Sequence, residues 1–549
     1  MAVDGAIAHQ VSLVALLAGT LLSVGILYRI SGRDPLRRVR TRLLVGIPWG
    51  TVLVLAGLYG TFYIVQGAAR GEPVVVGFRS WSYFYPAGML IAPFAHSGLG
   101  HLTGNALSTV VFAPVAEYAW SHYPTTRGSH AFGSLLENPF ARVGVFVGAT
   151  VVVGLATSVL IPGALIGFSG VVFAFAGFAL VTRPVLAVFA LVGRRAVSLV
   201  YFSARDPVFT ARAQPQFVSP FWADIAIQGH ALGLLVGILA GLWLAHRRDQ
   251  WPSVRRIWFA VLVFAVEQTL YALYWQSGVD EFVLFRGAGT ALVFLLAGVT
   301  AAAFTRRDRL LVARIGLSRR ELAVGVLLVG VFAIALAALP YNLVTIGADG
   351  PAGNGSVEVR DYTVTYAENV ENRYVAGVRI PVVGQPLSID ESGVIVTSPR
   401  RNAWEVVVQA QALAFRGREA FPVGGLGWRE TVVANRTTWQ TVDGPSTYKV
   451  FLRAGSEPRQ LVFTADPATV PAVINGTRVR IAPARSGYDL ELLRNDSLVG
   501  TGPVPTGGTN VTVADITFNR TDNSLRAIHD RTRLRIATFR LKEKPDPQN

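Results

Sequence analysis

The chain has 549 residues, of which 51% are hydrophobic and only 15% are charged, whereas a soluble chain carries about 25% charged residues. It has no cysteine, which excludes disulfides, a thiol nucleophile and thiolate metal sites. The net charge is +16. Because basic charge in a membrane protein marks cytoplasmic loops, nucleic-acid binding is not expected. Apolar runs of about twenty residues recur through the first 345 positions, which excludes a soluble or disordered chain and predicts an all-α polytopic membrane bundle there.

Ten apolar spans are expected to form transmembrane helices, since about 20 helical residues cross a hydrocarbon core of about 30 Å. The spans are 6–28, 43–66, 87–119, 140–161, 165–182, 184–203, 222–245, 257–276, 283–305 and 322–346. The stretch 87–119 is too long for one helix, so its helix is expected to begin near residue 98. The first span lacks a cleavage site after it and is expected to be retained.

Residues 349–549 have a different pattern, which predicts a β-rich, sandwich-like domain. Alternating segments typical of strands occur at 356–364, 404–412, 448–453 and 470–480. Glycine and proline separate these segments, as in sheets with frequent turns.

Two signals place this domain outside the cell membrane. Arginine-rich loops at 29–42, 246–256 and 305–321 fall on one side of a ten-helix count, which makes that side cytoplasmic and places the N-terminus outside. The β-rich region also holds six Asn-x-Ser/Thr sequons, which are glycosylation acceptors in exported domains. They begin at Asn354, Asn435, Asn475, Asn495, Asn510 and Asn519. The alternative is that Thr-rich strands create these sequons by accident.

Polar residues inside three of the spans are candidates for chemistry, because such groups are costly in a bilayer. His101 and Asn105 are four residues apart and share a helix face. Ser169 lies in another span and His230 in a third. His230 belongs to a ridge of glycines spaced by four, which permits close approach of a neighbouring helix. The ridge consists of Gly229, Gly233, Gly237 and Gly241.

These residues suit acyl transfer, although helix packing alone is the alternative explanation of each. A hydroxyl becomes a nucleophile beside a base, so His230 is the expected base for Ser169, in a dyad without a third member. All four polar residues are expected within about two turns of the outer helix ends. The free N–H groups where the Ser169 helix begins, with His101 and Asn105, would form an oxyanion hole.

The order of these motifs resembles the rhomboid intramembrane serine proteases. The resemblance covers about residues 43–245 and rests on three patterns: His96-x4-His101-x3-Asn105, then Gly167-x-Ser169-Gly170, then His230-x2-Gly233-x3-Gly237. Glu117 and Phe173 also stand where the family often has Glu and an aromatic residue.

The resemblance implies roles for these residues. It makes Ser169 the nucleophile and His230 the general base. His101, Asn105 and the Ser169 N–H would form the oxyanion hole, with His96 supporting the site through hydrogen bonds. It implies a six-helix core and cleavage of transmembrane segments of single-pass membrane proteins near the outer face, after a small residue. No cofactor or metal is expected, since His96 and His101 are only a weak metal-binding pair.

The chain departs from the family pattern in several places. Where the family often has Trp-Arg shortly before its first His, this chain has Arg79-Ser80-Trp81, fifteen residues upstream. Segments 1–42, 246–348 and 349–549 lie outside the core: an extra helix with a basic loop, three further helices and the external domain. Loop 204–221, with three prolines, is expected to cap the site.

Two other functions remain open from the sequence. The chain could be a catalytically silent rhomboid-like scaffold or receptor whose external domain binds a partner. It could also be a transporter that uses Glu267 and Arg286, although these two could simply pair, or Arg286 could reach the outer surface. The other histidines are expected to be solvated surface residues; they are His9, His122, His130, His246 and His529.

Overall fold

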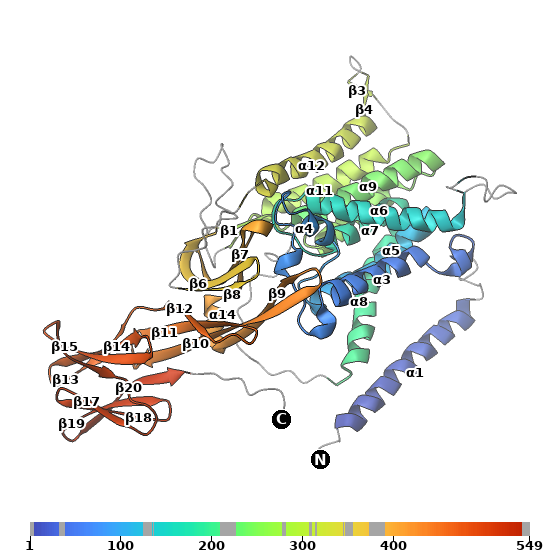
Figure 1. The fold of residues 1–549 in the computed structure, drawn as a ribbon. Coiled ribbons are helices and arrows are strands. Elements are labelled where there is room, and N and C mark those ends of the chain that lie inside the picture. Colours follow the sequence, from blue (N-terminus) through green and yellow to red (C-terminus); the bar gives the residue numbers. More distant parts are fainter. Residues whose placement is uncertain are drawn as a thin grey trace. The chain divides into compact units, whose positions relative to one another are not determined.

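A computed structural model describes residues 5–31, 39–124, 134, 137–208, 227–276, 282–306, 310–312, 316–343, 345, 355–372 and 390–540. The chain divides into two compact units, Met1–Leu343 and Val344–Asn549. Most of the helices belong to the first unit and most of the strands to the second (Figure 1).

The first unit is mainly helical, and each of the ten predicted spans contains a helix, although the span 257–276 is helical only to Glu267 and ends in strand β1 (Tyr274–Gln276). These helices are α1 (Gly5–Ser31), α3 (Trp49–Gly60, continued by a π turn over Thr61–Val65), α5 (Leu99–Trp120), α6 (Pro139–Val159), α7 (Ser169–Thr182), α8 (Pro184–Arg205), α9 (Ile227–Arg248), α10 (Val254–Glu267), α11 (Arg286–Ala303) and α12 (Arg319–Asn342). Helix α5 begins at Leu99, as expected, whereas the residues before it, which were expected to form only loop, contain a short helix, α4 (Pro86–Ile91). Strand β1 pairs with β2 (Phe282–Leu284), and β3 (Leu310–Val312) pairs with β4 (Leu317–Ser318). Among the described residues, α1, α6, α8, α9, α11 and α12 are long and apolar enough to cross a membrane, and α3 and α7 are shorter apolar helices.

The glycine ridge of α9 places this helix in backbone contact with α7. A Cβ added at Gly233 would lie 1.9 Å from the Gly170 oxygen, and one at Gly237 would lie 2.1 Å from the Ala174 oxygen. From the other side, a Cβ at Gly177 would lie 2.4 Å from the Leu234 oxygen. Any larger residue at these positions would push the two helices apart.

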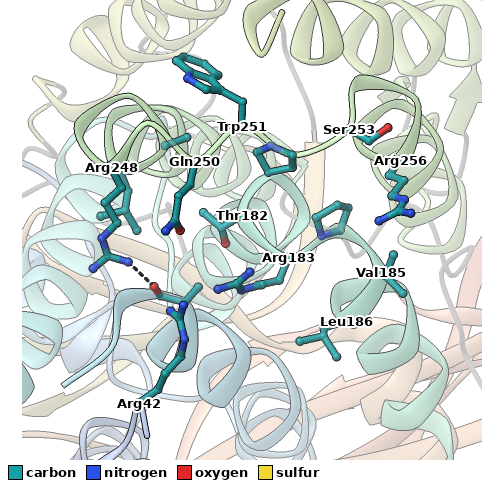
Figure 2. A pocket seen from close by; sticks show the side chains of 15 residues that line it. Arg42, Thr182, Arg183, Val185, Leu186, Arg248, Gln250, Trp251, Ser253 and Arg256 are labelled. Atoms are coloured by element: carbon teal, nitrogen blue, oxygen red, sulfur yellow. Dashed lines mark hydrogen bonds between the residues drawn. The ribbon is translucent and has the colours of Figure 1, made fainter. Parts of the chain in front are cut away.

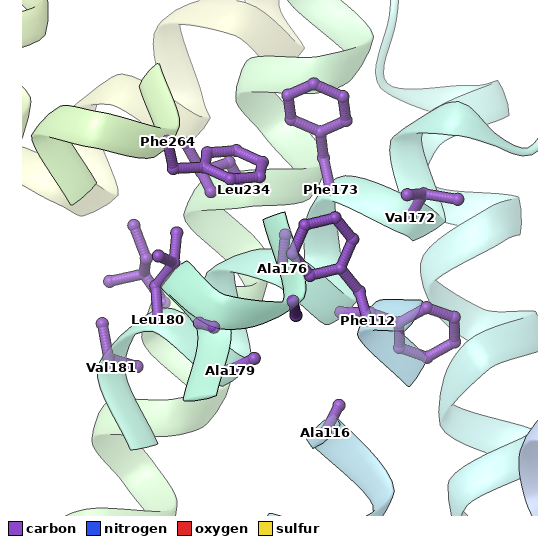
Figure 3. Packing of buried hydrophobic residues seen from close by; sticks show 14 of the residues in the cluster. Phe112, Ala116, Val172, Phe173, Ala176, Ala179, Leu180, Val181, Leu234 and Phe264 are labelled. Atoms are coloured by element: carbon purple, nitrogen blue, oxygen red, sulfur yellow. The ribbon is translucent and has the colours of Figure 1, made fainter. Parts of the chain in front are cut away.

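Helix α7 is the centre of the helical unit. Eleven of its 14 residues are buried, as expected for a helix that is apolar on every face. Figure 3 shows Phe112 of α5, Phe173 of α7, Leu234 of α9 and Phe264 of α10 in one cluster. The Phe264 ring lies 5.4 Å from that of Phe173 and 5.8 Å from that of Phe112. Helix α10 therefore packs directly on the core, although it lies outside the segment 43–245.

A buried carboxylate ties α3 to the end of α5. Glu117 accepts hydrogen bonds from the Gly50 N–H at 2.6 Å and from the Thr51 N–H at 2.8 Å. The imidazole of His122 lies 2.6 Å from the same carboxylate and accepts a 2.9 Å bond from the Leu44 N–H. The expectation that His122 is a solvated surface residue is therefore wrong: it is fully buried, because it satisfies a buried carboxylate.

The described residues of the second unit form three antiparallel sheets. One sheet contains β5 (Ser356–Val359), β6 (Tyr362–Glu371), β7 (Asp390–Ser398) and β8 (Ala403–Gln409), and another contains β13 (Ala468–Ile474), β14 (Thr477–Ala484), β15 (Gly487–Arg494) and β16 (Ser497–Pro503). The largest joins β9 (Arg418–Gly425), β10 (Trp428–Thr441), β11 (Ser446–Ala454), β12 (Gln460–Thr464), β17 (Asn510–Val513), β18 (Ile516–Thr521), β19 (Ser524–His529) and β20 (Thr532–Arg540).

The largest sheet and the β13–β16 sheet share one hydrophobic core. Trp439 of β10, Leu490 of β15 and Phe518 of β18 belong to the same buried cluster, which gives the sandwich-like packing that the sequence predicts. The predicted strand 404–412 is shorter than expected, because the helix α14 (Ala410–Arg416) begins at Ala410. The predicted strand 470–480 is a hairpin, because Asn475 and Gly476 have positive φ and form its turn.

Candidate functional site

Ser169 is the first residue of α7, and the backbone before it turns sharply. Gly167 has a φ of 127°, which only glycine adopts readily, and its N–H donates to the Ala92 oxygen at 2.9 Å. The Phe168 oxygen accepts from the N–H groups of Val171 and Val172. The N–H groups of Ser169 and Gly170 precede these donors, so they belong to the helix terminus that lacks intrahelical acceptors.

His230 lies in the first turn of α9, beside the start of α7. Its imidazole stacks on the Phe173 ring with centroids 4.1 Å apart and planes 7° apart. A Cβ added at Gly170 would lie 3.3 Å from the Gly229 oxygen. Ser169 and His230 therefore lie at the same end of two helices that are in backbone contact.

The hydroxyl and the imidazole are not hydrogen-bonded to each other in the described part of the chain. His230 Nδ1 is buried and has no partner there. Catalytic hydrogen bonds often tighten only when substrate binds, so this geometry is compatible with His230 as a base.

His101 and Asn105 lie one turn apart on α5, as their spacing predicts, and His101 lies against the backbone that leads to Ser169. A Cβ at Gly167 would lie 2.7 Å from His101 Nε2, so only glycine fits here. Ser97 Oγ lies 3.1 Å from His101 Nδ1 and holds the ring. The Asn105 side chain is buried, and its Nδ2 has no partner among the described residues.

A cavity of about 30 Å³ adjoins Ser169. Its lining residues are Ala92, Pro93, Thr157, Ser158, Leu165, Ile166, Gly167, Ser169, Gly170 and Gly229. One water needs about 10–15 Å³ of such space, so the cavity has room for about two waters beside the hydroxyl.

Gln66 is a residue of this region that the sequence analysis missed. Its Nε2 donates to the His96 oxygen at 2.8 Å, and its Oε1 accepts from the His96 N–H at 2.8 Å. The His96 ring is buried 5.1 Å from the His101 ring, and neither of its nitrogens has a partner among the described residues. The signal in the sequence that could have identified Gln66 is a lone amide side chain at the end of an apolar span. Support of the site by His96 ring hydrogen bonds stays a prediction.

The segment Arg79-Ser80-Trp81 packs against the loop that precedes Ser169. Arg79 Nη1 donates to the Ala164 oxygen at 3.0 Å, and the Ser80 N–H donates to the Leu165 oxygen at 3.0 Å. The buried Trp81 anchors the segment by donating to the Val76 oxygen. The cap predicted at 204–221 lies outside the described residues from 209 onward.

The membrane charges Glu267 and Arg286 do not pair with each other. Glu267 pairs with Arg195 of α8 instead, whereas Arg286 begins α11. The Arg195 side chain is 72% exposed and that of Glu267 is 32% exposed. This pair lies on the outside of the bundle, where it ties α8 to α10.

The sequons differ in accessibility. Asn475 and Asn495 are exposed in hairpin turns, and Asn510 is exposed where β17 begins. Asn435 and Asn519 are half-buried within strands, and Asn354 lies outside the described residues. Attachment of glycans at these sites stays a prediction, and it is best supported at the turn positions.

Comparison with known families identifies the class of protein. Residues 83–247 match the family model of the Rhomboid domain, a range that includes α4 to α9 and every residue of the site except Gln66 and the segment 79–81. The chain therefore contains a Rhomboid domain within a multi-pass membrane protein. No curated protein and no solved structure gave a significant match.

Proposed function

We propose that the chain is an intramembrane serine endopeptidase in which Ser169 is the nucleophile and His230 the general base. The observation that carries this proposal is the contact between α7 and α9. It brings both residues to the same end of the bundle, on either side of a backbone approach that only glycine permits. Phe173 holds the imidazole against α7 by stacking.

The reaction is an acyl transfer in two steps. Ser169 Oγ attacks the peptide carbonyl while His230 accepts its proton and then passes it to the leaving amine. A water molecule, activated by the same imidazole, attacks the acyl-enzyme and regenerates the free hydroxyl.

The negative oxygen of the tetrahedral intermediate needs donors placed in advance. The N–H of Ser169, the His101 imidazole beside Gly167 and the unpartnered Asn105 amide are the candidates. A buried amide N–H without a partner costs about 1–3 kcal/mol. An enzyme recovers such a cost when the transition state supplies the acceptor.

The orientation in the membrane follows from charge. Arg42, Arg183 and Arg248 gather where α7 and α9 end, opposite Ser169, and the positive-inside rule makes that end cytoplasmic. In this orientation Ser169 lies near the outer face of the membrane, and the N-terminus and the β-rich unit lie outside. The substrates would be transmembrane segments of single-pass proteins, cleaved near the outer face after a small residue.

Labelling with a fluorophosphonate tests this proposal. The purified wild type is expected to be labelled at Ser169, and Ser169→Ala should abolish the adduct. His230→Ala should slow labelling at least about 100-fold. Ser108→Ala, which removes a hydroxyl group from α5 rather than from α7, should have no effect on labelling. If the wild-type protein is not labelled, the alternative function, a catalytically silent rhomboid-like scaffold, is favoured. The observation that supports this alternative is the absence of a hydrogen bond between Ser169 and His230.

A further inference from the structure

A second pocket lies at the opposite end of the bundle from Ser169. It has a volume of about 510 Å³ and is formed where α5, α7 and α9 end and where α8 and α10 begin. Helix α7 separates the two sites by its 14 residues, or about 20 Å. Figure 2 shows Arg42, Arg183, Arg248 and Arg256 around this pocket.

The pocket is basic and holds no carboxylate among its lining residues. The nearest acidic residue in sequence, Asp249, does not line the pocket. Its Oδ1 accepts from Nε1 of the lining residue Trp251 at 2.9 Å, and its Oδ2 lies 3.9 Å from Arg306, outside the pocket. Burial lowers the pKa of the Arg183 guanidinium, and the nearby charge of Arg42 lowers it further. The arginines therefore repel one another without a neutralising partner from the lining.

Helix capping accounts for only part of this charge. Arg248 donates to the Ala119 oxygen at 2.8 Å, the bond that the dashed line in Figure 2 marks, and to the Trp120 oxygen at 2.6 Å, and so caps α5. Arg183 Nε is buried and has no hydrogen-bond partner in the described part of the chain. Arg256 forms no ion pair there and is exposed. At least two cations thus remain available to a ligand.

We propose that this pocket binds a phosphate-bearing anion on the cytoplasmic side, either the headgroup of an anionic phospholipid or a soluble phosphate. Guanidinium groups match phosphate oxygens in geometry and charge. Basic pockets between transmembrane helices on this side bind anionic headgroups. Val185 and Leu186 of α8 line the same pocket and are 46% and 45% exposed, so they offer contact to the lipid chains.

The test uses the purified full-length chain in a nonionic detergent. Its unfolding temperature is measured during titration with short-chain phosphatidylglycerol, short-chain phosphatidylcholine or inorganic phosphate. We expect saturable stabilisation by phosphatidylglycerol and a weaker effect of phosphatidylcholine. Stabilisation by inorganic phosphate alone would identify the ligand as a soluble anion, and stabilisation by phosphatidylglycerol alone would identify a lipid headgroup.

Matched variants separate this pocket from general charge. Arg183→Gln and Arg256→Gln should each raise the apparent dissociation constant at least about tenfold. Arg255→Gln removes the neighbouring charge on α10, which lies outside the pocket, and should change the apparent dissociation constant less than about twofold. If Arg183→Gln fails to fold, the dissociation constant of the Arg256→Gln variant, at an exposed position, decides the test. Equal weakening by Arg255→Gln, or no saturable stabilisation by phosphatidylglycerol or inorganic phosphate, would overturn the proposal, whatever the outcome of labelling at Ser169.

Discussion

The polar residues around Ser169 use their hydrogen-bonding capacity to different extents. His101 is held by Ser97, and the backbone of His96 is held by both ends of the Gln66 amide. Asn105 Nδ2 and His230 Nδ1 are buried without partners in the described residues. Buried polar groups are normally satisfied, so these two mark the positions where a reacting molecule is expected to supply the missing partner.

Replacing Asn105 by Ala should separate a catalytic donor from a structural residue. If Asn105 stabilises the oxyanion, kcat for a transmembrane reporter should fall about 100- to 1,000-fold, with KM nearly unchanged. Thermal stability should stay the same or rise, because a buried unpaired group is removed. A higher KM with unchanged kcat would contradict this role.

In the β-rich unit, one ion pair links stability to pH. Asp361 accepts from Arg401 Nε at 2.6 Å and from Nη2 at 3.1 Å. Burial disfavours the Asp361 carboxylate, but Arg401 outweighs this effect and holds its pKa below the ordinary value of 3.8. A carboxyl group whose pKa is lowered by folding stabilises the fold at pH values above its pKa in the unfolded state. This stabilisation is lost as the pH falls through the pKa of the folded state.

Asp361→Asn should therefore destabilise this unit by about 2 kcal/mol at neutral pH, the value of a charge-assisted hydrogen bond. The difference from the wild type should narrow below pH 3.8. Thermal unfolding at a series of pH values measures this difference in stability. Asp466→Asn, a substitution at an exposed position, is the control. A difference that does not change with pH would exclude the linkage.

At the residue scale, motif spacing predicted much of the candidate site and missed its buried partners. The order of His101, Asn105, Ser169 and His230 predicted the Rhomboid domain that residues 83–247 match, and the spacing of His101 and Asn105 placed both on one helix face. Gln66 and His122 could not be assigned, because their burial depends on Glu117 and on loops distant in sequence. An amide or imidazole near a loop looks the same whether it is solvated or buried.

At the scale of elements, the contact between α7 and α9 makes the site possible. Gly233→Ala would place a methyl group 1.9 Å from the Gly170 oxygen, so the helices must separate. We expect a lower unfolding temperature and the loss of most cleavage activity.

Gly148→Ala on α6 is the matched control for this change, because a Cβ there meets nothing within 4 Å. It should be neutral or slightly stabilising, since Ala favours a helix more than Gly does. Equal behaviour of the two variants would contradict the proposed contact.

Apolar length predicted the helices well, whereas strand ends depended on local detail. All ten spans contain a helix because a bilayer demands a long apolar run, although only six of the described helices are long and apolar enough to cross a membrane. The end of β8 and the turn at Asn475 were missed. An alternating pattern continues through a short helix or a tight hairpin without a break in hydrophobicity.

At the scale of the whole molecule, the core and the additional segments differ in how much the sequence reveals. The Rhomboid family model covers α4 to α9, but Phe264 of α10 also packs on Phe173. This contact joins a helix outside the Rhomboid domain to the site. Such packing is invisible in a single sequence, because any apolar helix could face either lipid or protein.

We propose that the β-rich unit recruits substrates. Deleting residues 349–549 should then leave cleavage of a short reporter within about twofold of the wild type and reduce cleavage of a native substrate at least about tenfold. Both rates are measured on the same preparation. Equal loss of both would mean that the unit is needed for folding rather than for recruitment.

Cleavage of a transmembrane reporter by the purified full-length chain tests the central claim most directly. We expect Ser169→Ala and His230→Ala each to lower the rate at least about 1,000-fold, and the double variant to be no worse than either, because the two residues act as a unit. Ser108→Ala should cleave normally. Cleavage by Ser169→Ala at the wild-type rate would contradict the account.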